Sequence, residues 1–203
     1  MIGGLLKFSM IDFPGKISAI VFTQGCNLKC GYCHNPELIP TAPANPPALT
    51  DEDVLYYLEK RRGALDGVVI TGGEPAVQPD LKDFITKIKA MGYMVKLDTN
   101  GTNPALLQDL LDNKLVDFVA MDIKAPPDKY SSVCGGPVDI EKIKASIMLL
   151  RNSGLPHEFR TTYDKTLLDD EDIAALKQEF PDLKVQECNP VKPAKDTLSL
   201  FGS

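Results

Sequence analysis

Three cysteines within eight residues constrain this chain more than any other feature. Cys26, Cys30 and Cys33 are spaced C-x3-C-x2-C, directly after a short apolar run that is typical of a strand. Thiolates that stand this close repel one another unless a soft metal or a cluster holds them. The spacing therefore predicts a metal or cluster site on a loop at the end of a strand.

Three kinds of site are compatible with this spacing. The first is a structural zinc site, with the ligands Cys26, Cys30, Cys33 and His34. Such sites usually take two ligands from each of two separated segments, and a second segment is lacking here. The second is covalent haem, because residues 30–34 read C-x-x-C-H, but this leaves Cys26 without a role. The third is an iron–sulfur cluster held by three thiolates, which keeps one iron open.

The composition is that of an ordinary globular protein. A length of 203 residues suffices for one domain with a full hydrophobic core, so a single domain over residues 1–203 is expected. No apolar stretch approaches the ~18 residues of a membrane span, and residues 1–15 lack the apolar core of a signal peptide. An odd number of cysteines without an export signal predicts reduced thiols in the cytoplasm. The net charge of −6 argues against a general nucleic-acid binder.

Strand and helix patterns alternate along the chain. Apolar, β-branched runs predict six strands, at 17–23, 67–71, 94–99, 116–123, 157–163 and 183–188. Helical periodicity and capping signals predict five helices, at 50–62, 81–91, 103–113, 139–152 and 170–179. The proline-rich residues 40–47 and the glycine-containing residues 131–137 are expected to be loops. This alternation predicts an α/β fold with a parallel sheet and right-handed connections.

Six units are too few to close an eight-unit barrel, so we expect an open, partial (β/α)6 barrel. Ligands of parallel α/β sheets bind at the carboxyl ends of the strands. The unusual residues all follow strands: the cysteines the first, Gly72-Gly73-Glu74-Pro75 the second, Asp98-Thr99-Asn100-Gly101 the third, and Asp122 and Lys124 the fourth. Their shared position predicts one ligand site on this rim.

Each of these features also has an interpretation that needs no ligand. These are a tight turn at Gly72 and Gly73, an Asx turn at Asp98 and Asn100, a surface ion pair between Asp122 and Lys124, and a core aromatic at Tyr32. Cys134 and Cys188 belong to no spacing motif and are interpreted as plain reduced cysteines. For Arg160, strand alternation alone does not decide between an inward and an outward side chain.

The cysteine motif, with Tyr32 before its last cysteine, and the Gly-Gly-Glu-Pro run resemble the radical S-adenosylmethionine (SAM) family. The resemblance implies a radical SAM barrel, with a [4Fe–4S] cluster on Cys26, Cys30 and Cys33 and with SAM on the open iron. It also implies that Gly72, Gly73 and Glu74 hold the SAM amino group and that Tyr32 packs near the adenine.

The Asp-Thr-Asn-Gly run at 98–101 and the Met-Asp-Ile-Lys run at 121–124 resemble the glycyl radical enzyme activating proteins of that family. This resemblance implies that Asp98 and Asp122 face the methionine ammonium of SAM, that Lys124 contacts its ribose or carboxylate side, and that Asn100 also belongs to the cofactor-binding residues. Carboxylates there would also be favoured by charge, because the ammonium and sulfonium of SAM are cationic.

Residues 7–15 and 33–37 are most similar to activating proteins of anaerobic ribonucleoside-triphosphate reductase. The resemblance implies reductive cleavage of SAM, a glycyl radical formed on that partner enzyme, and an electron donor such as flavodoxin or ferredoxin. Neither a membrane nor a nucleic-acid partner is expected. The chain lacks the second cysteine-rich insert of some activases. Its last strand also lacks a histidine that some relatives use near the ribose, which leaves either Asn189 or no residue in that role.

Two alternatives follow from the same residues. One is an activase for another glycyl radical enzyme, of the formate acetyltransferase type. The other is a non-catalytic binding protein stabilised by zinc at the cysteines.

Overall fold

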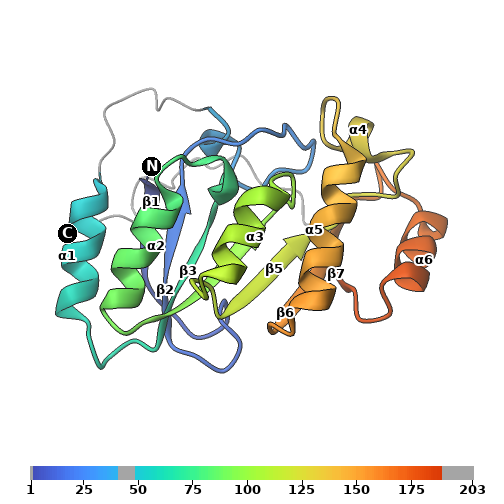
Figure 1. The fold of residues 1–203 in the computed structure, drawn as a ribbon. Helices are drawn as coiled ribbons and strands as arrows, with labels where there is room; N and C mark the ends of the chain where they lie inside the picture. Colours follow the sequence, from blue (N-terminus) through green and yellow to red (C-terminus); the bar gives the residue numbers. More distant parts are fainter. Residues whose placement is uncertain (1, 41–48, 189–203) are drawn as a thin grey trace.

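A seven-stranded sheet forms the centre of the computed structural model, which describes residues 2–40 and 49–188 (Figure 1). The strands lie in sequence order: β1 (Ile2–Ser9), β2 (Ser18–Thr23), β3 (Gly67–Gly72), β4 (Met94–Thr99), β5 (Phe118–Asp122), β6 (His157–Tyr163) and β7 (Lys184–Glu187). Strands β2 to β7 run parallel, whereas β1 pairs antiparallel with β2. Asn189 and the proline-rich residues 41–47 lie outside the described residues.

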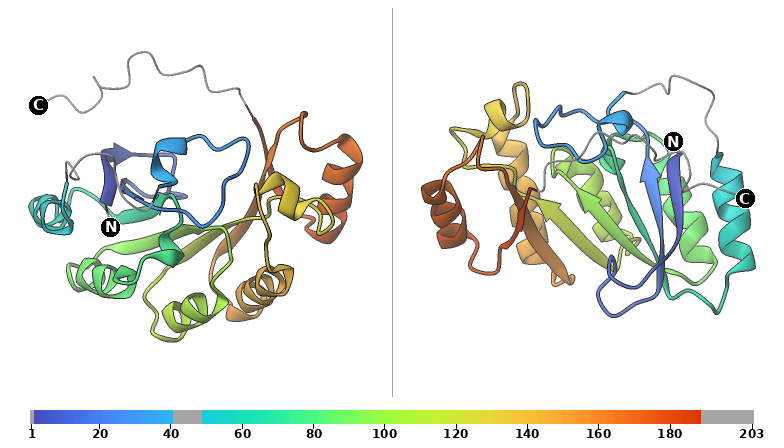
Figure 2. Two further views of the ribbon diagram at one scale, coloured as in Figure 1. Left: turned by 90° about the horizontal axis from the view of Figure 1, so that it is seen from above. Right: turned by 180° about the vertical axis from the view of Figure 1, so that it is seen from behind.

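Helices connect the parallel strands. They are α1 (Asp51–Lys60), α2 (Leu81–Ala90), α3 (Pro104–Asp112), α4 (Tyr130–Val133), α5 (Ile140–Ser153) and α6 (Asp170–Glu179), with short 3-10 turns η1 (Pro36–Leu38) and η2 (Pro75–Val77). Seen from above, the longer helices form an arc along one side of the sheet, and the cysteine loop (residues 25–34) lies on the other, concave side (Figure 2). The predicted α/β fold with an open barrel of six parallel strands is confirmed.

Strand β1 is an addition to the six predicted strands. Gly3 and Gly4 disfavour a strand locally, and the apolar Leu6 and Phe8 are 48% and 51% exposed, so the run has no clean alternation. It becomes a strand by pairing with β2, with Leu5 opposite Val21. Only a long-range contact specifies this element, which explains why local patterning misses it.

The predicted ends of the other strands and long helices differ from the observed ones by at most two residues. β5 begins later than expected because the Asp117 carboxylate accepts a 2.7 Å hydrogen bond from the backbone N–H of Val95, in place of a ladder bond. The expectation of a loop over 131–137 is wrong in part, since α4 occupies its start. A single turn, with Tyr130 and Val133 buried, is too short to give a periodic signal.

The predicted capping signals act as expected. The Thr50 side chain accepts a hydrogen bond from the Asp53 N–H, and the Asp53 carboxylate accepts one from the Thr50 N–H, which is a reciprocal capping box. Asn103 caps α3, with Pro104 as its first residue. α5 ends at Gly154, whose φ of 68° is left-handed. These signals fix where α1 and α3 begin and where α5 ends.

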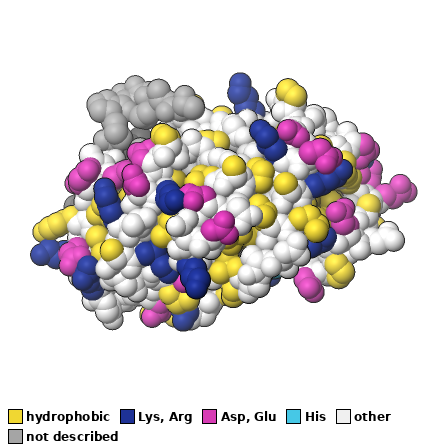
Figure 3. All heavy atoms as spheres, in the orientation of Figure 1, with side chains coloured by type: hydrophobic (Ala, Val, Ile, Leu, Met, Phe, Trp, Pro, Cys, Tyr) yellow, Lys and Arg dark blue, Asp and Glu magenta, His cyan; other side chains and the backbone are white. Residues whose placement is uncertain are grey.

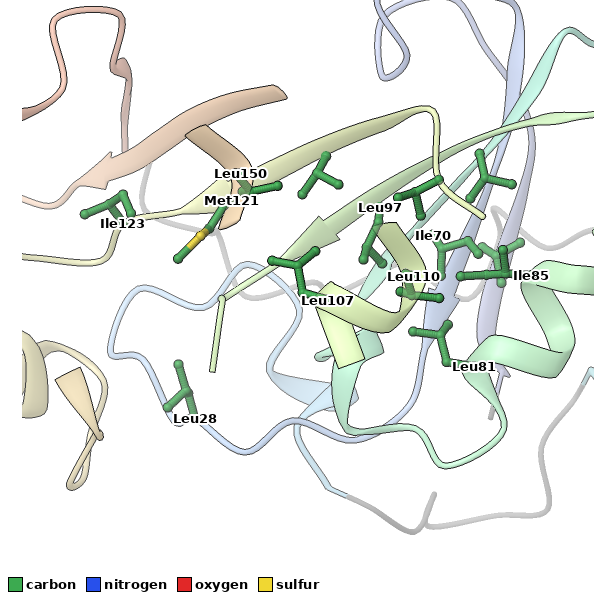
Figure 4. Close-up of a cluster of buried hydrophobic side chains, with 14 of the residues drawn as sticks. Leu28, Ile70, Leu81, Ile85, Leu97, Leu107, Leu110, Met121, Ile123 and Leu150 are labelled. Atoms are coloured by element: carbon green, nitrogen blue, oxygen red, sulfur yellow. The ribbon is translucent and has the colours of Figure 1, made fainter. Parts of the chain in front are cut away.

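The main core lies between the sheet and the arc of helices. Figure 4 shows part of it, with Leu107 of α3 and Met121 of β5 in one cluster. Leu28, from the cysteine loop, is buried in the same cluster and anchors that loop to the core. A smaller cluster of Phe13, Ile20 and Val69 fills the other side of the sheet.

On the face seen in Figure 3, acidic and basic side chains are interspersed. None of the helices in the part of the chain that the structure describes has the length and apolar character needed to cross a membrane.

Candidate active site

The residues predicted to carry chemistry meet at one end of the sheet. A cavity of about 230 Å³ opens at the carboxyl ends of the parallel strands. Its lining includes Cys26, Cys30, Tyr32, Cys33, Gly72, Gly73, Glu74, Asp98, Asn100, Asp122 and Lys124. The structure thus brings together every residue of the predicted site, and what they bind stays a prediction. Arg160 of β6 and Gln186 of β7 line the same cavity.

The three cysteines lie on a loop that is held at its start and in its middle. The Gly25 N–H donates to the Leu38 carbonyl at 2.8 Å, and the Lys29 N–H donates to the Cys134 carbonyl at 2.9 Å. All three thiols are half-buried. Across residues 2–40 and 49–188, no three Cys, His, Asp or Glu side chains converge closely enough to hold a metal ion. The three thiols therefore line one cavity but do not converge on one point. The same holds for the four ligands of the alternative zinc site, Cys26, Cys30, Cys33 and His34.

Cys134 supports this loop, which its sequence context does not reveal. It is buried, and a hydrogen bond from its thiol lowers the pKa of Cys30, with a further contribution from Lys124 and against the effect of burial. Burial instead raises the pKa of Cys26 to about 11. Cys134 thus supports the loop both through its carbonyl and through its thiol. Cys188 does not line the cavity.

Gly72 and Gly73 allow β3 to end against the start of the cysteine loop. Gly72 has a φ of 113°, and a Cβ atom there would lie 2.4 Å from the backbone nitrogen of Thr23. A Cβ atom on Gly73 would lie 2.2 Å from the carbonyl oxygen of Gly25. The close approach that two glycines predict is therefore made to the neighbouring backbone, in the wall of the cavity.

The Glu74 carboxylate turns toward the end of β4. It accepts hydrogen bonds from the Thr99 hydroxyl at 2.7 Å, from the Asn100 N–H at 2.7 Å and from the Ala76 N–H at 2.9 Å. Its side chain is fully buried. Burial raises the pKa of Glu74 to about 7, although these hydrogen bonds act to lower it. Glu74 thus ties the turn after β3 to the turn after β4.

Stability is expected to depend on pH through Glu74. Because its folded pKa of about 7 lies above the ordinary value of 4.5, the folded state keeps this proton to higher pH than the unfolded chain. Its contribution is complete below about pH 4.5 and is lost as the pH rises through 7, by about 3 kcal/mol in all. Urea unfolding of the cluster-free protein should show this loss, and Glu74→Gln should remove it. Equal pH slopes in the two proteins would contradict the assignment.

The acidic residues of the rim are paired with cations. Arg160 donates to Asp122 at 3.0 Å and to Asp98 at 3.3 Å, and Lys124 donates to Asp122 at 2.9 Å. Lys96, nearly fully buried, donates to the other oxygen of Asp98. The strand alternation left the direction of Arg160 open, and the structure directs it inward, between two carboxylates that lie on different strands.

Within this network, Asp122 and Lys124 hold each other ionised. Burial acts to raise the pKa of Asp122, but Lys124 and Arg160 outweigh it and hold this pKa below its usual range. Burial likewise acts to lower the pKa of Lys124, but Asp122, Tyr32 and Cys30 raise it well above its usual value. The cavity thus offers fixed negative and positive charges side by side, which suits a ligand that carries both an ammonium and a carboxylate.

The resemblance to the radical SAM family predicts that Asp98 faces the ammonium of SAM. On that prediction, replacing Asp98 by asparagine is expected to weaken SAM binding about tenfold or more, because a charge-assisted contact would be lost and Lys96 and Arg160 would be left facing the cationic ligand. The dissociation constant of SAM should be measured on the reconstituted, reduced protein. Asp109→Asn, which breaks an ion pair with Lys82 on the helices, is the matched control. An unchanged dissociation constant with a large fall in melting temperature would assign Asp98 to folding instead.

Tyr32 has a polar atom without a partner among the described residues. Its hydroxyl is buried and unbonded, and the Lys124 ammonium lies 5.7 Å from the centre of its ring. A buried hydroxyl without a partner is costly, so it indicates a group that binds in the cavity. Three thiols, paired charges and this hydroxyl around one cavity fit an iron–sulfur cluster with a polar cofactor beside it.

Comparison with known proteins identifies the family of this chain. Residues 20–179 match the model of the radical SAM superfamily. The chain is 34% identical to a candidate glycyl-radical enzyme activating enzyme from Methanocaldococcus jannaschii, over 95% of this chain and 80% of that protein. It is 35% identical to the pyruvate formate-lyase-activating enzyme of Clostridium pasteurianum, over 64% of this chain and 55% of that enzyme. It therefore spans most of the first relative but only about half of the second.

Solved structures share the fold at low sequence identity. Native anSMEcpe with bound AdoMet has a TM-score of 0.63 at 19% identity, over 88% of this chain and 53% of that chain. Streptococcus suis SuiB bound to S-adenosylmethionine has a TM-score of 0.65 at 18% identity, over 86% and 41%. The family match and the nearly full-length relative show that this chain belongs to the radical SAM superfamily, among its glycyl-radical enzyme activating enzymes, and this membership implies a [4Fe–4S] cluster and SAM as cofactors.

Proposed function

We propose that this chain, as a single domain over residues 1–203, activates anaerobic ribonucleoside-triphosphate reductase in the cytoplasm by generating a glycyl radical on it. The observation that carries the radical chemistry is the common cavity, which joins three thiols to the paired charges of Asp98, Asp122 and Lys124. The motifs at 7–15 and 33–37 favour this particular target.

The cysteines and the charged residues of the cavity would have different roles. Cys26, Cys30 and Cys33 would hold the cluster, and Asp98, Asp122 and Lys124 would orient the amino-acid end of SAM beside it. When bound, the cluster and SAM supply the electron transfer and bond cleavage that allow a hydrogen atom to be taken from a glycine. Glu74 and Asn100 would line the SAM side of the cavity, where Glu74 also accepts the Asn100 N–H and the Asn100 side chain bonds to Asn27.

A second target is favoured by the named relatives. Pyruvate formate-lyase-activating enzymes from Clostridium pasteurianum and Staphylococcus epidermidis are 35% and 33% identical to this chain. An activase for a formate acetyltransferase is therefore the alternative to test. In either case a flavodoxin or ferredoxin is the proposed electron donor.

The test compares the two targets side by side. The reconstituted protein is mixed with SAM, dithionite and either anaerobic ribonucleoside-triphosphate reductase or a formate acetyltransferase, and the glycyl radical is counted by electron paramagnetic resonance. We expect a radical on the reductase. A radical only on the acetyltransferase would transfer the assignment to that enzyme. If the protein binds zinc and forms no 5′-deoxyadenosine from SAM, a binding protein without turnover is the correct description.

A further inference from the structure

Asn27 forms a closed ring of hydrogen bonds that no predicted role explains. Its amide nitrogen donates to the Thr102 hydroxyl at 2.8 Å, and its amide oxygen accepts from the Asn100 amide at 2.9 Å. The Thr102 hydroxyl in turn donates to the Asn100 amide oxygen at 2.7 Å. These three side chains come from the cysteine loop and from the turn after β4, which are more than seventy residues apart in sequence.

The ring continues into the wall of the cavity. The backbone N–H of Asn100 donates to the Glu74 carboxylate, which also accepts a hydrogen bond from the Thr99 hydroxyl. The turn after β3, the turn after β4 and the cysteine loop are thereby connected by one hydrogen-bonded network. Such networks hold groups in fixed relative positions when each member is satisfied.

The residues that follow Asn27 in the cysteine loop are held by core packing and by a backbone hydrogen bond. Leu28 is buried in the core, and the Lys29 N–H is bonded to the Cys134 carbonyl. Asn27 therefore supplies side-chain hydrogen bonds between this loop and the turn that follows the strand carrying Asp98. A cofactor that contacts both the cluster and Asp98 needs the two sides of the cavity within about 0.5 Å of their working positions.

We propose that Asn27, through Asn100 and Thr102, is a positioning residue that sets the cysteine loop at the right distance from the SAM side of the cavity. This inference rests on the proposed radical SAM function of the same site. Asn27 does not hold the cluster or SAM itself, so its loss should change SAM affinity and loop order more than the amount of cluster bound.

The variants are chosen to break the ring from both sides. Asn27→Ala removes it from the cysteine loop, and Thr102→Val removes only the hydroxyl from the β4 turn while keeping the side-chain shape. Thr102→Ser retains the hydroxyl and should behave as the native protein. Lys29→Ala, a truncation in the same loop at an exposed position, is the control for a change in the loop alone.

Three measurements follow on each variant. Amide hydrogen exchange of residues 26–33 in the full-length, cluster-free chain reports loop order. The SAM dissociation constant of the reconstituted protein, without any partner, reports the cavity. Steady-state formation of 5′-deoxyadenosine with dithionite separates KM for SAM from kcat, and iron is counted throughout.

We expect Asn27→Ala and Thr102→Val each to weaken SAM binding about fivefold, through KM rather than kcat, with the iron content retained. The double variant should resemble either single one, because both break the same ring, whereas independent effects would multiply to about 25-fold. Exchange in the loop should be faster in all three, and Thr102→Ser should match the native protein.

An Asn27→Ala protein that is indistinguishable from Lys29→Ala, or a double variant whose effects multiply, would overturn the proposal. These outcomes are separable from a failure of the proposed function. If the native protein forms no 5′-deoxyadenosine, the function fails, while the exchange rates of the cluster-free chain still decide whether Asn27 orders the loop.

Discussion

Replacing Cys30 by serine is expected to abolish the cluster and, with it, all cleavage of SAM. Changing even the neighbours of a metal ligand costs about 10–100-fold in affinity or activity, and loss of the ligand should cost more. The Cys134 thiol and Lys124 both favour the thiolate of Cys30, which is the form that binds iron. Iron counting and visible absorbance after anaerobic reconstitution measure the effect, and Cys26→Ser and Cys33→Ser should give the same result.

The two remaining cysteines separate ligation from general thiol loss. Cys188→Ser lies outside the cavity and should retain the cluster. Cys134→Ser tests in addition whether a neighbour of Cys30 affects the cluster, because Cys134 is buried beside the loop and contacts Cys30. Full retention of the cluster in Cys30→Ser would refute the three-cysteine assignment.

Replacing Gly73 by alanine is expected to displace the cysteine loop and to destabilise the fold. The new methyl group would lie 2.2 Å from the Gly25 carbonyl oxygen and 2.9 Å from that of Leu38, and both atoms are backbone that cannot rotate away. Overpacking of this kind costs about 1–3 kcal/mol. Because the displaced segment leads directly into Cys26, the reconstituted variant should also bind less iron.

Gly136→Ala is the matched control for this substitution. It lies in the loop before α5, and a Cβ atom there would meet nothing within 4 Å. Urea unfolding and iron counting on both variants separate a general glycine effect from the specific clash at Gly73. Native-like stability together with full iron content in Gly73→Ala would show that the loop can move away at little cost.

The positions of the parallel strands along the chain, and of the rim residues at their ends, follow from local sequence. Continuous β-branched runs specify buried parallel strands, and capping pairs such as Thr50 and Asp53 specify where helices begin. The position of the cysteines just after a strand, and of Asp98 at the end of one, follows from the same pattern. Sequence could predict these features because each depends on neighbours within a few residues, and because parallel strands place their carboxyl ends on one rim.

What the side chains on that rim do was decided only by the tertiary structure. Glu74 points to the β4 turn, Arg160 lies between two aspartates, and Cys134 lies beside Cys30. Asn27 reaches Thr102, and β1 exists only because β2 pairs with it. Each of these contacts joins segments that are distant in sequence, and a hydrogen bond or ion pair depends on atomic distances that no local residue pattern encodes.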